Sequence, residues 1–450
     1  MHKPRSGHVL QEVLGFADET PSRKEASHRQ RLKRLLSGKL DFHGEYSNYA
    51  VHSWHSFPAK FPPQLPRLLI RELTEPGEIV FDPMMGSCTT LTEAMLLNRR
   101  ALGSDIDPLA LEIAKAKLKT INASDVWATG RRILASAQKA CDRNADGLAK
   151  EFERRFNENT RTFIDYWFRK KTQLELISLV REIECLLDPC LRDFFKLVFS
   201  SIIITKSGGV SLARDLAHTR PHKVEKKPTS VFVEFWRRLQ RVLRDYYPAA
   251  SVKDPSIFEA DARNLPLRDN SVDLIVTSPP YASHAIDYMR AHKFSLVWFG
   301  YPVEHLSALR KKYIGGDSIG DVRLLPMPKH SGQVVRSLSH LDSKKGLVLH
   351  RYYSEMMQIL LEMFRVIKRG RAVVVVVGSS RMRGIDVQTD KCLSEIGEEV
   401  GFHLVHVAER RMDRDRRMMP ARWHGNGGNN IELRMHKEFV LGFLKPASEP

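Results

Sequence analysis

The chain has 450 residues, of which 42% are hydrophobic, and its 71 Lys and Arg outnumber 53 Asp and Glu to give a formal net charge of +18. This length suits two or three domains, or one catalytic domain with large insertions. The five cysteines show no CxxC pair or Cys/His ligand spacing, which argues against a disulfide framework and a zinc site. The positive charge is typical of a protein that binds phosphates, without distinguishing DNA from RNA.

No targeting segment is visible in the sequence. Residues 1–15 have no apolar core of signal-peptide length, and no stretch of 18 apolar residues occurs anywhere. We therefore expect a soluble, cytoplasmic protein. Residues 1–50 are polar and basic, and they are predicted to be either an arm that follows phosphates or a solvated helix.

Residues 51–122 are predicted to form the first half of an α/β domain. A short apolar strand at 78–82 leads into a turn of small residues around Gly86, and a helix is expected to begin near Thr89 or Thr90. Such a turn lets the backbone approach a ligand, and the helix behind it offers free N–H groups. The next strand ends at Asp105, where an acidic residue typically binds ribose hydroxyls.

Residues 123–250 do not fit a minimal α/β sheet. Their apolar residues recur at helical spacing, so we expect an inserted helical subdomain, a candidate for contacting DNA. Within it, 206–227 is a polar loop whose glycines, hydroxyls and cations suit a segment that orders on a phosphate backbone, although a plain surface loop fits nearly as well. The candidate phosphate contacts in this loop are Arg214, Arg220 and Lys223.

The strongest chemical signal is the tetrapeptide at 278–281, which follows a buried strand at 272–277. Each proline lacks an N–H and has a fixed φ, so the carbonyls of Ser278 and Pro279 are expected to face a pocket at the carboxyl edge of a sheet. The Tyr281 ring can stack on a flat heterocycle, while Ser278 Oγ and a carbonyl hold an exocyclic amine. A structural turn with a core tyrosine is the alternative interpretation.

The remaining residues, 251–450, are predicted to form the second half of the domain. A helix at 286–299 carries polar side chains toward the expected pocket. Residues 301–349, which contain Lys311 and Lys312, are predicted to be an irregular insertion that either reads bases or separates strands. A helix at 351–367, ended by 368–370, precedes a buried strand at 372–377. A helix at 391–400 and strands at 403–408 and 438–444 complete the sheet.

The segment 410–430 contains six arginines and a glycine- and asparagine-rich loop. It is the strongest basic patch in the sequence, and we expect it to bind nucleic acid. The phosphate contacts proposed in it are Arg416, Arg417 and Arg422.

With these segments in order, the chain resembles the amino-methyltransferases of the DNA N4-cytosine/N6-adenine family, which use S-adenosylmethionine. The resemblance covers most of the chain and implies a Rossmann-like, doubly wound sheet with a helical insertion and long basic loops. Residues 278–281 match the catalytic tetrapeptide, so Ser278, Pro279, Pro280 and Tyr281 are the implied catalytic residues. The family's cofactor motifs match residues before and along both halves of the sheet: Phe57, Pro58, Lys60, Phe61, Asp82, Pro83, Met85, Gly86, Ser87, Cys88, Thr89, Asp105, Ile106, Asp261, Ala262 and Ser278.

The resemblance further implies duplex DNA with a flipped target base, no metal, and a possible partner restriction endonuclease. Members with Ser at the first corner position mostly act on cytosine N4, and those with Asp or Asn mostly act on adenine N6, so Ser278 favours cytosine. One residue departs from the family pattern, because Cys88 stands where a second glycine is usual. Four alternatives stay open: an adenine-N6 enzyme, an RNA amino-methyltransferase, a catalytically silent nucleic-acid-binding homologue, and a small-molecule methyltransferase, which the charge disfavours.

Overall fold

The computed structural model describes most of the chain from residue 27 onward. The described residues are 27–58, 60, 62–205, 209–214, 223–225, 229–244, 254–282, 287–316, 323–378, 380–412 and 437–447. No helix within these ranges is long and apolar enough to cross a membrane.

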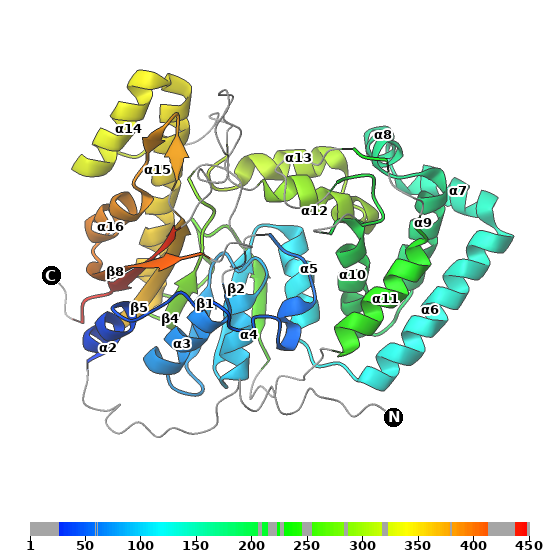
Figure 1. The fold of residues 1–450 in the computed structure, drawn as a ribbon, viewed down its shortest axis with the longest axis horizontal. Helices are drawn as coiled ribbons and strands as arrows, with labels where there is room; N and C mark the ends of the chain where they lie inside the picture. Colours follow the sequence, from blue (N-terminus) through cyan, green and yellow to red (C-terminus); the bar gives the residue numbers. More distant parts are fainter. Residues whose placement is uncertain are drawn as a thin grey trace.

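A seven-stranded sheet in the order β3-β2-β1-β4-β5-β9-β8 forms the centre of the molecule (Figure 1). The first five strands of this order are parallel, whereas β9 is antiparallel to both β5 and β8. The chain runs outward from β1 to β3 and then returns to β4, so β1 and β4 flank the switch point at which doubly wound sheets bind ligands. The strands are β1 (Ile79–Asp82), β2 (Arg100–Asp105), β3 (Ser256–Glu259), β4 (Val272–Thr277), β5 (Ile367–Gly378), β8 (His403–Arg411) and β9 (Lys437–Leu444).

Both faces of the sheet are buried, which explains its continuous apolar strands. Alternate residues of β5 enter two different cores: Val373 and Val375 lie in one, and Val374 and Val376 lie in the other. The first core is covered by α14 (Lys329–Leu341), α15 (Ser343–Val366) and α16 (Thr389–Glu399), and the second by α2 (His28–Leu36), α3 (Gln64–Leu73), α4 (Thr89–Leu96) and part of α5 (Pro108–Lys117). The α/β fold predicted from the sequence is confirmed.

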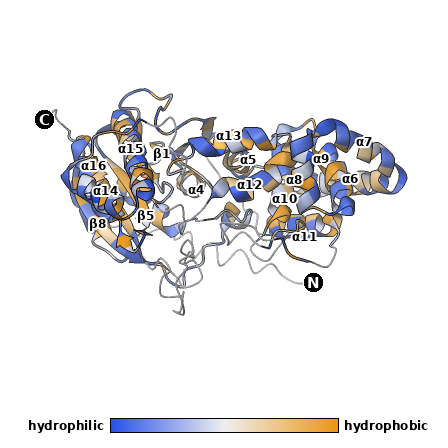
Figure 2. Ribbon diagram, turned by 90° about the horizontal axis from the view of Figure 1, so that it is seen from above, coloured by the Kyte–Doolittle hydropathy of each residue, from blue (hydrophilic) through white to orange (hydrophobic). Residues whose placement is uncertain are grey.

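A helical region lies at the other end of the molecule from α14 and α16 (Figures 1 and 2). Its aromatic core includes Phe168, Phe194, Phe235 and Trp298, all fully buried. The 3-10 helix η2 (Val297–Phe299) contributes to this core, and α12 and α13 lie between the two ends of the molecule. The helices are α6 (Ala123–Arg143), α7 (Ala145–Arg155), α8 (Glu158–Trp167), α9 (Lys170–Glu184), α10 (Pro189–Ile203), α11 (Val231–Arg244), α12 (Tyr288–Leu296) and α13 (Val303–Lys312).

The expectation of an irregular stretch at 301–349 is wrong. α13 and α14 form within it, and α15 begins at Ser343. The glycines that suggested turns serve packing, because a Cβ on Gly346 would collide with the backbone and side chain of Ser339 in α14. Gly332 likewise lies inside α14 and not in a turn.

The predicted helix end at residue 367 is correct to within one residue, but residues 368–370 do not form the segment that ends the helix, because they already belong to β5, which begins at Ile367 directly after α15. Lys445 replaces the expected glycine cap: its buried Nζ donates to the carbonyls of Phe364 and Ile367, at 2.7 and 3.0 Å. Gly370 has a φ of +73° within the strand, and its N–H donates to Lys445 O at 2.9 Å. A contact 75 residues distant in sequence therefore sets this boundary.

Part of the basic N-terminal segment belongs to the core. Helix α2 is capped by Ser27 and buries Leu32 and Leu36 against Gly442 of β9. Helix α2 is therefore packed on the sheet and is not a solvated helix. Residues 1–26 lie outside the described residues.

We expect Gly442→Val to destabilise the protein by about 1–3 kcal/mol, because the added side chain would collide with Leu32 and Leu36. Valine favours strands, so a loss would report this collision and not strand propensity. The free energy of unfolding in urea measures it. Gly332→Ala is the control: its Cβ would lie 3.3 Å from the flexible end of Arg336 and at an ordinary contact distance of 3.7 Å from Met327, so stability should be unchanged or slightly higher. An unchanged Gly442→Val midpoint would contradict the packing of α2 on β9.

Candidate active site

A hydrogen bond joins the ends of β1 and β4. Thr277 Oγ1, at the end of β4, donates to Asp82 Oδ1, at the end of β1, at 2.7 Å. Asp82 also accepts from Met84 N at 3.1 Å, and Thr90 Oγ1 donates to Val276 O at 3.2 Å. Burial raises the pKa of Asp82 to about 6, although these donors oppose the shift. The glycine turn and the tetrapeptide therefore leave neighbouring strands at one edge of the sheet.

The turn after β1 is held from the adjacent strand β2. Met85 N donates to Ser104 O at 3.1 Å, Ser104 Oγ donates to Pro83 O at 3.2 Å, and Gly86, at φ +43°, donates to Asp105 Oδ2 at 2.9 Å. The predicted helix start after the turn is confirmed, since α4 begins at Thr89.

The backbone conformation at Cys88 explains why the family that the chain resembles usually has a second glycine at this position. Its backbone is left-handed, with φ +65° and ψ 29°, which costs a residue with a side chain about 1–2 kcal/mol. The thiol is fully buried, and burial raises its pKa to about 12. A buried, neutral thiol is a poor nucleophile. Cys88 therefore serves as a packing residue of the turn.

Asp105, which was predicted to bind ribose hydroxyls, holds the glycine turn in place through hydrogen bonds. One carboxylate oxygen accepts from Gly86 N and the other from Asp107 N, each at 2.9 Å. Burial, followed by the charge of Asp107, raises the pKa of Asp105 to about 7. Each oxygen keeps a lone pair that could accept from a hydroxyl. Ile106, half-buried, lies between the two acids.

Aromatic rings from two distant segments cover the turn. The Phe57 ring lies close enough to Gly86 that a Cβ there would be 3.2 Å from it. Its centroid is 5.0 Å from that of His292 and 5.8 Å from that of Tyr288, both in α12. The segment around Phe57 is tied down by Lys60 Nζ, which donates to His52 O at 2.8 Å. Pro58 is half-buried beside it, and Phe61 lies outside the described residues.

Sequence reasoning missed two buried residues of this region. Glu93 in α4 is fully buried and accepts from Tyr49 and Arg67, and His52 Nε2 lies 2.7 Å from its Oε1. Asp107 Oδ2 lies 2.6 Å from His292 Nδ1, which lowers the pKa of Asp107 although burial opposes it. A glutamate in an apolar helix was the signal for the first, whereas Asp107 was masked by its ordinary role as the N-cap of α5.

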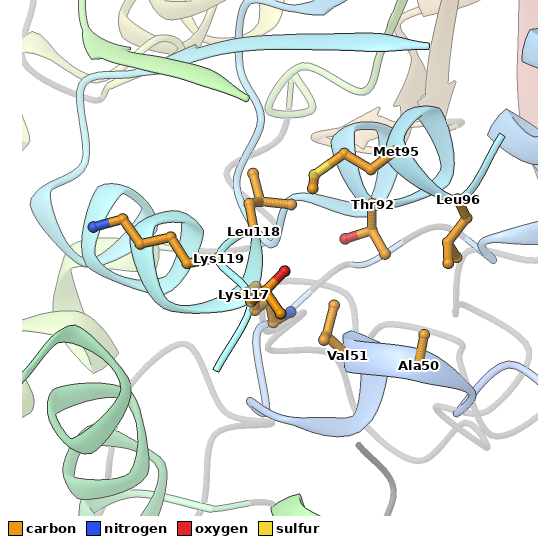
Figure 3. Close-up of a pocket in the computed structure, with 9 residues that line it drawn as sticks. Ala50, Val51, Thr92, Met95, Leu96, Lys117, Leu118 and Lys119 are labelled. Carbon is orange, nitrogen blue, oxygen red and sulfur yellow. The ribbon is translucent and has the colours of Figure 1, made fainter. Parts of the chain in front are cut away.

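A small pocket lies behind the turn, between α4, the end of α5 and the 3-10 helix η1 (Ala50–Ser53) (Figure 3). Its lining includes Val51, Thr92, Met95 and Lys117, and none of the predicted cofactor residues. Lys117 Nζ donates to Ser87 O at 2.9 Å, and burial lowers its pKa to about 8. The ammonium group thus supports the turn from behind.

The segment after β3 is paired with an arginine. Arg263 donates to both carboxylate oxygens of Asp261, from Nε at 2.9 Å and from Nη2 at 2.6 Å, and it lowers the pKa of Asp261 although burial opposes it. The same guanidinium donates to Glu355 and to the carbonyl of Lys312. Ala262 is buried. Asp261 is therefore connected to the end of α13.

The tetrapeptide forms a half-buried corner. Ser278, Pro280 and Tyr281 are half-buried, whereas Pro279 is buried. The Tyr281 hydroxyl donates to Glu438 Oε1 at 2.9 Å, and burial, with the nearby Glu438, raises the pKa of Tyr281 well above its usual value.

The described candidate phosphate contacts fall in two places. Lys311 and Lys312 are exposed at the end of α13, near the Asp261 loop. Arg214 and Lys223 are exposed in the helical region, where the Lys223 ammonium lies 4.5 Å from the centroid of Tyr166. Arg220, Arg416, Arg417 and Arg422 lie outside the described residues. Among the residues that are described, no group of three or more His, Cys, Asp or Glu could hold a metal ion.

Comparison with known proteins agrees with this arrangement. Residues 3–116 match the family model of the N6/N4 DNA methylases. This part of the chain is similar to the family, and the similarity indicates a DNA methyltransferase that uses S-adenosylmethionine as its cofactor.

Two relatives span nearly the whole chain. It is 25% identical to the type II methyltransferase M.MvaI of Kocuria varians, over 92% of this chain and 96% of that protein. It is 22% identical to the type II methyltransferase M.BsoBI of Geobacillus stearothermophilus, over 85% of each. Among solved structures, a putative RNA methyltransferase, PH1948 from Pyrococcus horikoshii, aligns with 93% of this chain and 98% of its own. Its identity is 9% and its TM-score 0.31, too low to support any inference.

Substitutions at Cys88 should show that this methyltransferase needs a left-handed residue in its turn. We expect Cys88→Gly to be more stable than Cys88→Ala by about 1 kcal/mol, because only glycine adopts φ +65° without strain. Both variants lose the same thiol, so their difference reports the backbone strain less the small gain from burying the methyl group of alanine. Urea unfolding measures it. If Cys88→Ala were the more stable variant, the strain assigned to this position would be absent.

Proposed function

We propose that this DNA methyltransferase methylates an exocyclic amine of a base that is flipped out of the duplex, and that the amine is N4 of cytosine. The observation that carries the proposal is the 2.7 Å hydrogen bond between Thr277 and Asp82. Because that bond fixes the ends of β4 and β1 together, a base held at the tetrapeptide and a cofactor held at the glycine turn would be neighbours.

The residues around the turn suit S-adenosylmethionine. Asp105 would accept hydrogen bonds from the ribose hydroxyls through its remaining lone pairs. Gly86 has no Cβ, which would lie 3.2 Å from the Phe57 ring, so its backbone can come close to a cofactor under that ring. Phe57 would cover the methionine end. The cofactor supplies a methyl group on a positively charged sulfur, which aromatic rings such as Phe57 and Tyr288 favour electrostatically.

The corner would position the amine and not activate it covalently. The ring of Tyr281 stacks on the flipped base, and Ser278 Oγ and the Pro279 carbonyl accept the two amine hydrogens. These bonds draw the nitrogen out of conjugation with the ring, so that its lone pair faces the methyl carbon in line with the breaking carbon–sulfur bond. As the carbon–sulfur bond breaks, its electron pair stays on sulfur and the nitrogen gains the methyl group; one amine proton passes to solvent, which leaves the base neutral.

The choice of cytosine rests on Ser278. In the family that the chain resembles, most members with Ser at the first position of the tetrapeptide methylate cytosine N4. Members with Asp or Asn at that position mostly methylate adenine N6. The names of M.MvaI and M.BsoBI as type II methyltransferases support a specific duplex sequence as the target.

DNA from cells that express the protein should contain N4-methylcytosine. Nucleoside digestion followed by mass spectrometry measures it, and DNA from cells without the protein is the control. N6-methyladenine in its place would refute the cytosine assignment while leaving the reaction class intact. Methylated nucleosides in RNA alone would refute DNA as the substrate.

Substitutions at the corner should separate catalysis from cofactor binding. We expect Ser278→Ala and Tyr281→Ala to abolish methyl transfer while calorimetry shows nearly unchanged affinity for S-adenosylmethionine, since the turn and Asp105 remain. Asp105→Ala is the matched contrast and should lose cofactor affinity. Fully active Ser278→Ala and Tyr281→Ala proteins would show that the corner does not hold the base.

A further inference from the structure

A group of cations lies on the two helices that follow the catalytic corner. Asp287, directly before α12, binds two arginines: Arg290 Nε lies 2.6 Å and Arg310 Nη2 2.5 Å from its Oδ2. Arg310 Nε also donates to Oδ1 at 3.1 Å. Lys311 and Lys312, the last two residues of α13, are both exposed. One carboxylate is thus set against four cations, so this group, the α12–α13 cations, keeps a net positive charge.

The end of α13 lies beside the corner in space. A Cβ on Gly315, three residues after Lys312, would lie 3.9 Å from the carbonyl oxygen of Tyr281. Arg263 Nη2 donates to Lys312 O at 3.1 Å, and the same guanidinium binds Asp261. The end of α13 therefore contacts both the corner and the loop that carries Asp261, and Figure 1 shows α12 and α13 between the sheet and the helical region.

A buried ion pair fixes the main chain that carries the two lysines. Arg351 and Glu355 of α15 are 1% and 0% exposed, and Arg351 Nε donates to Glu355 Oε1 at 3.0 Å. Arg351 Nη2 donates to Lys311 O at 3.1 Å and to Tyr313 O at 3.3 Å. Glu355 Oε2 accepts from Gly315 N at 2.8 Å. These bonds to the segment use its main-chain atoms, so they fix its path while the lysine side chains stay exposed.

Exposed cations on a fixed main chain suit phosphate groups. A guanidinium has five N–H groups, so Arg310 can bind Asp287 and a phosphate oxygen together. Lysine ammonium groups bind phosphates as point charges. Because the segment is already ordered, binding would cost less conformational entropy than with a free loop. Contacts of this kind position a duplex and do not read its bases.

We propose that Arg290, Arg310, Lys311 and Lys312 bind the phosphates of duplex DNA that flank the flipped nucleotide. A base that stacks on Tyr281 is joined through its sugar to these two phosphates, so they lie nearer the corner than any others of the duplex. The sequence predicted phosphate contacts for the two lysines; the structure adds the two arginines and the place on the DNA. This inference rests on the proposed function, since it requires the base to be held at Tyr281.

The salt dependence of DNA binding tests the charge of this group. The double variant Lys311→Gln/Lys312→Gln removes two charges and none of the main-chain hydrogen bonds, so its urea midpoint should equal that of the wild type. With a duplex that carries the methylation site mapped in cellular DNA, we expect the slope of log affinity against log salt concentration to become shallower by about 2. Fluorescence anisotropy measures it, and an unchanged slope would overturn the inference.

The matched control is Arg29→Gln/Lys33→Gln, which removes two charges from exposed residues of α2. This helix packs on Gly442, near the end of β9. Because β9 is antiparallel to β5, that end lies at the edge of the sheet opposite the corner. The control should keep the wild-type slope.

Uncharged methylphosphonate linkages locate the contact on the DNA. One duplex carries them on either side of the target nucleotide, and a second carries them at one end. We expect the flanking linkages to weaken binding by the wild type about tenfold, and to have little further effect on Lys311→Gln/Lys312→Gln, because the partners of those phosphates are already gone. Arg310→Gln should show the same pattern. The terminal linkages should affect the wild type and the double variant alike.

The outcomes separate this inference from the function on which it rests. If the flanking linkages weaken the wild type and the double variant equally, or weaken the wild type no more than the terminal linkages do, the inference is overturned while methyl transfer at the corner stands. Structured RNA that competes as well as the duplex would overturn DNA as the partner of this surface. The proposed function fails on different evidence, namely DNA without a methylated base or full activity of Tyr281→Ala.

Discussion

The arrangement of this site depends on the hydrogen bond between Thr277 and the buried carboxylate of Asp82. β1 and β4 lie nearly 200 residues apart in sequence, and few of their residues pair directly. The bond from Thr277 to Asp82, with that from Thr90 to Val276, fixes where each strand ends. Everything that follows either strand, the glycine turn on one side and the tetrapeptide on the other, starts from these fixed points.

Paired charged groups, some buried and some half-buried, fix the loops above the sheet edge in the same way. Glu93 holds the segment before Phe57, Arg263 joins the Asp261 loop to the end of α13, and Glu438 holds Tyr281. Each charged group is paired and hydrogen-bonded, which offsets much of the cost of removing it from water. Because an unpaired member would be strongly unfavourable, such clusters select one loop geometry over others. The functional edge is therefore ordered by polar contacts, whereas the rest of the sheet is ordered by aliphatic packing.

The wrong predictions from the sequence share one cause: residues distant in the chain contact the segments concerned and change their local structure. The glycines in 301–349 suggested turns, yet Gly346 allows α14 and α15 to approach closely. The lysine, arginine and glycine at 368–370 suggested the cap of a helix, yet Lys445, directly after the last strand, binds the carbonyls at the end of that helix. The basic composition before residue 50 suggested a segment in solvent, yet two leucines of α2 fill a space left by Gly442. Local composition shows which residues a segment contains, but it does not show which other parts of the protein that segment packs against.

The sequence by itself determined the α/β class, the turn around Gly86 and the proline corner, because apolar periodicity, glycine and proline act on the backbone within a few residues. It also pointed to Cys88 as unusual, although only the backbone angle of +65° explains why glycine is the usual residue there. The tertiary structure alone decided that β9 runs antiparallel and brings Glu438 to Tyr281, and that Asp107 meets His292. Strand direction and contacts between distant loops depend on how the whole chain closes on itself, and no local pattern encodes them.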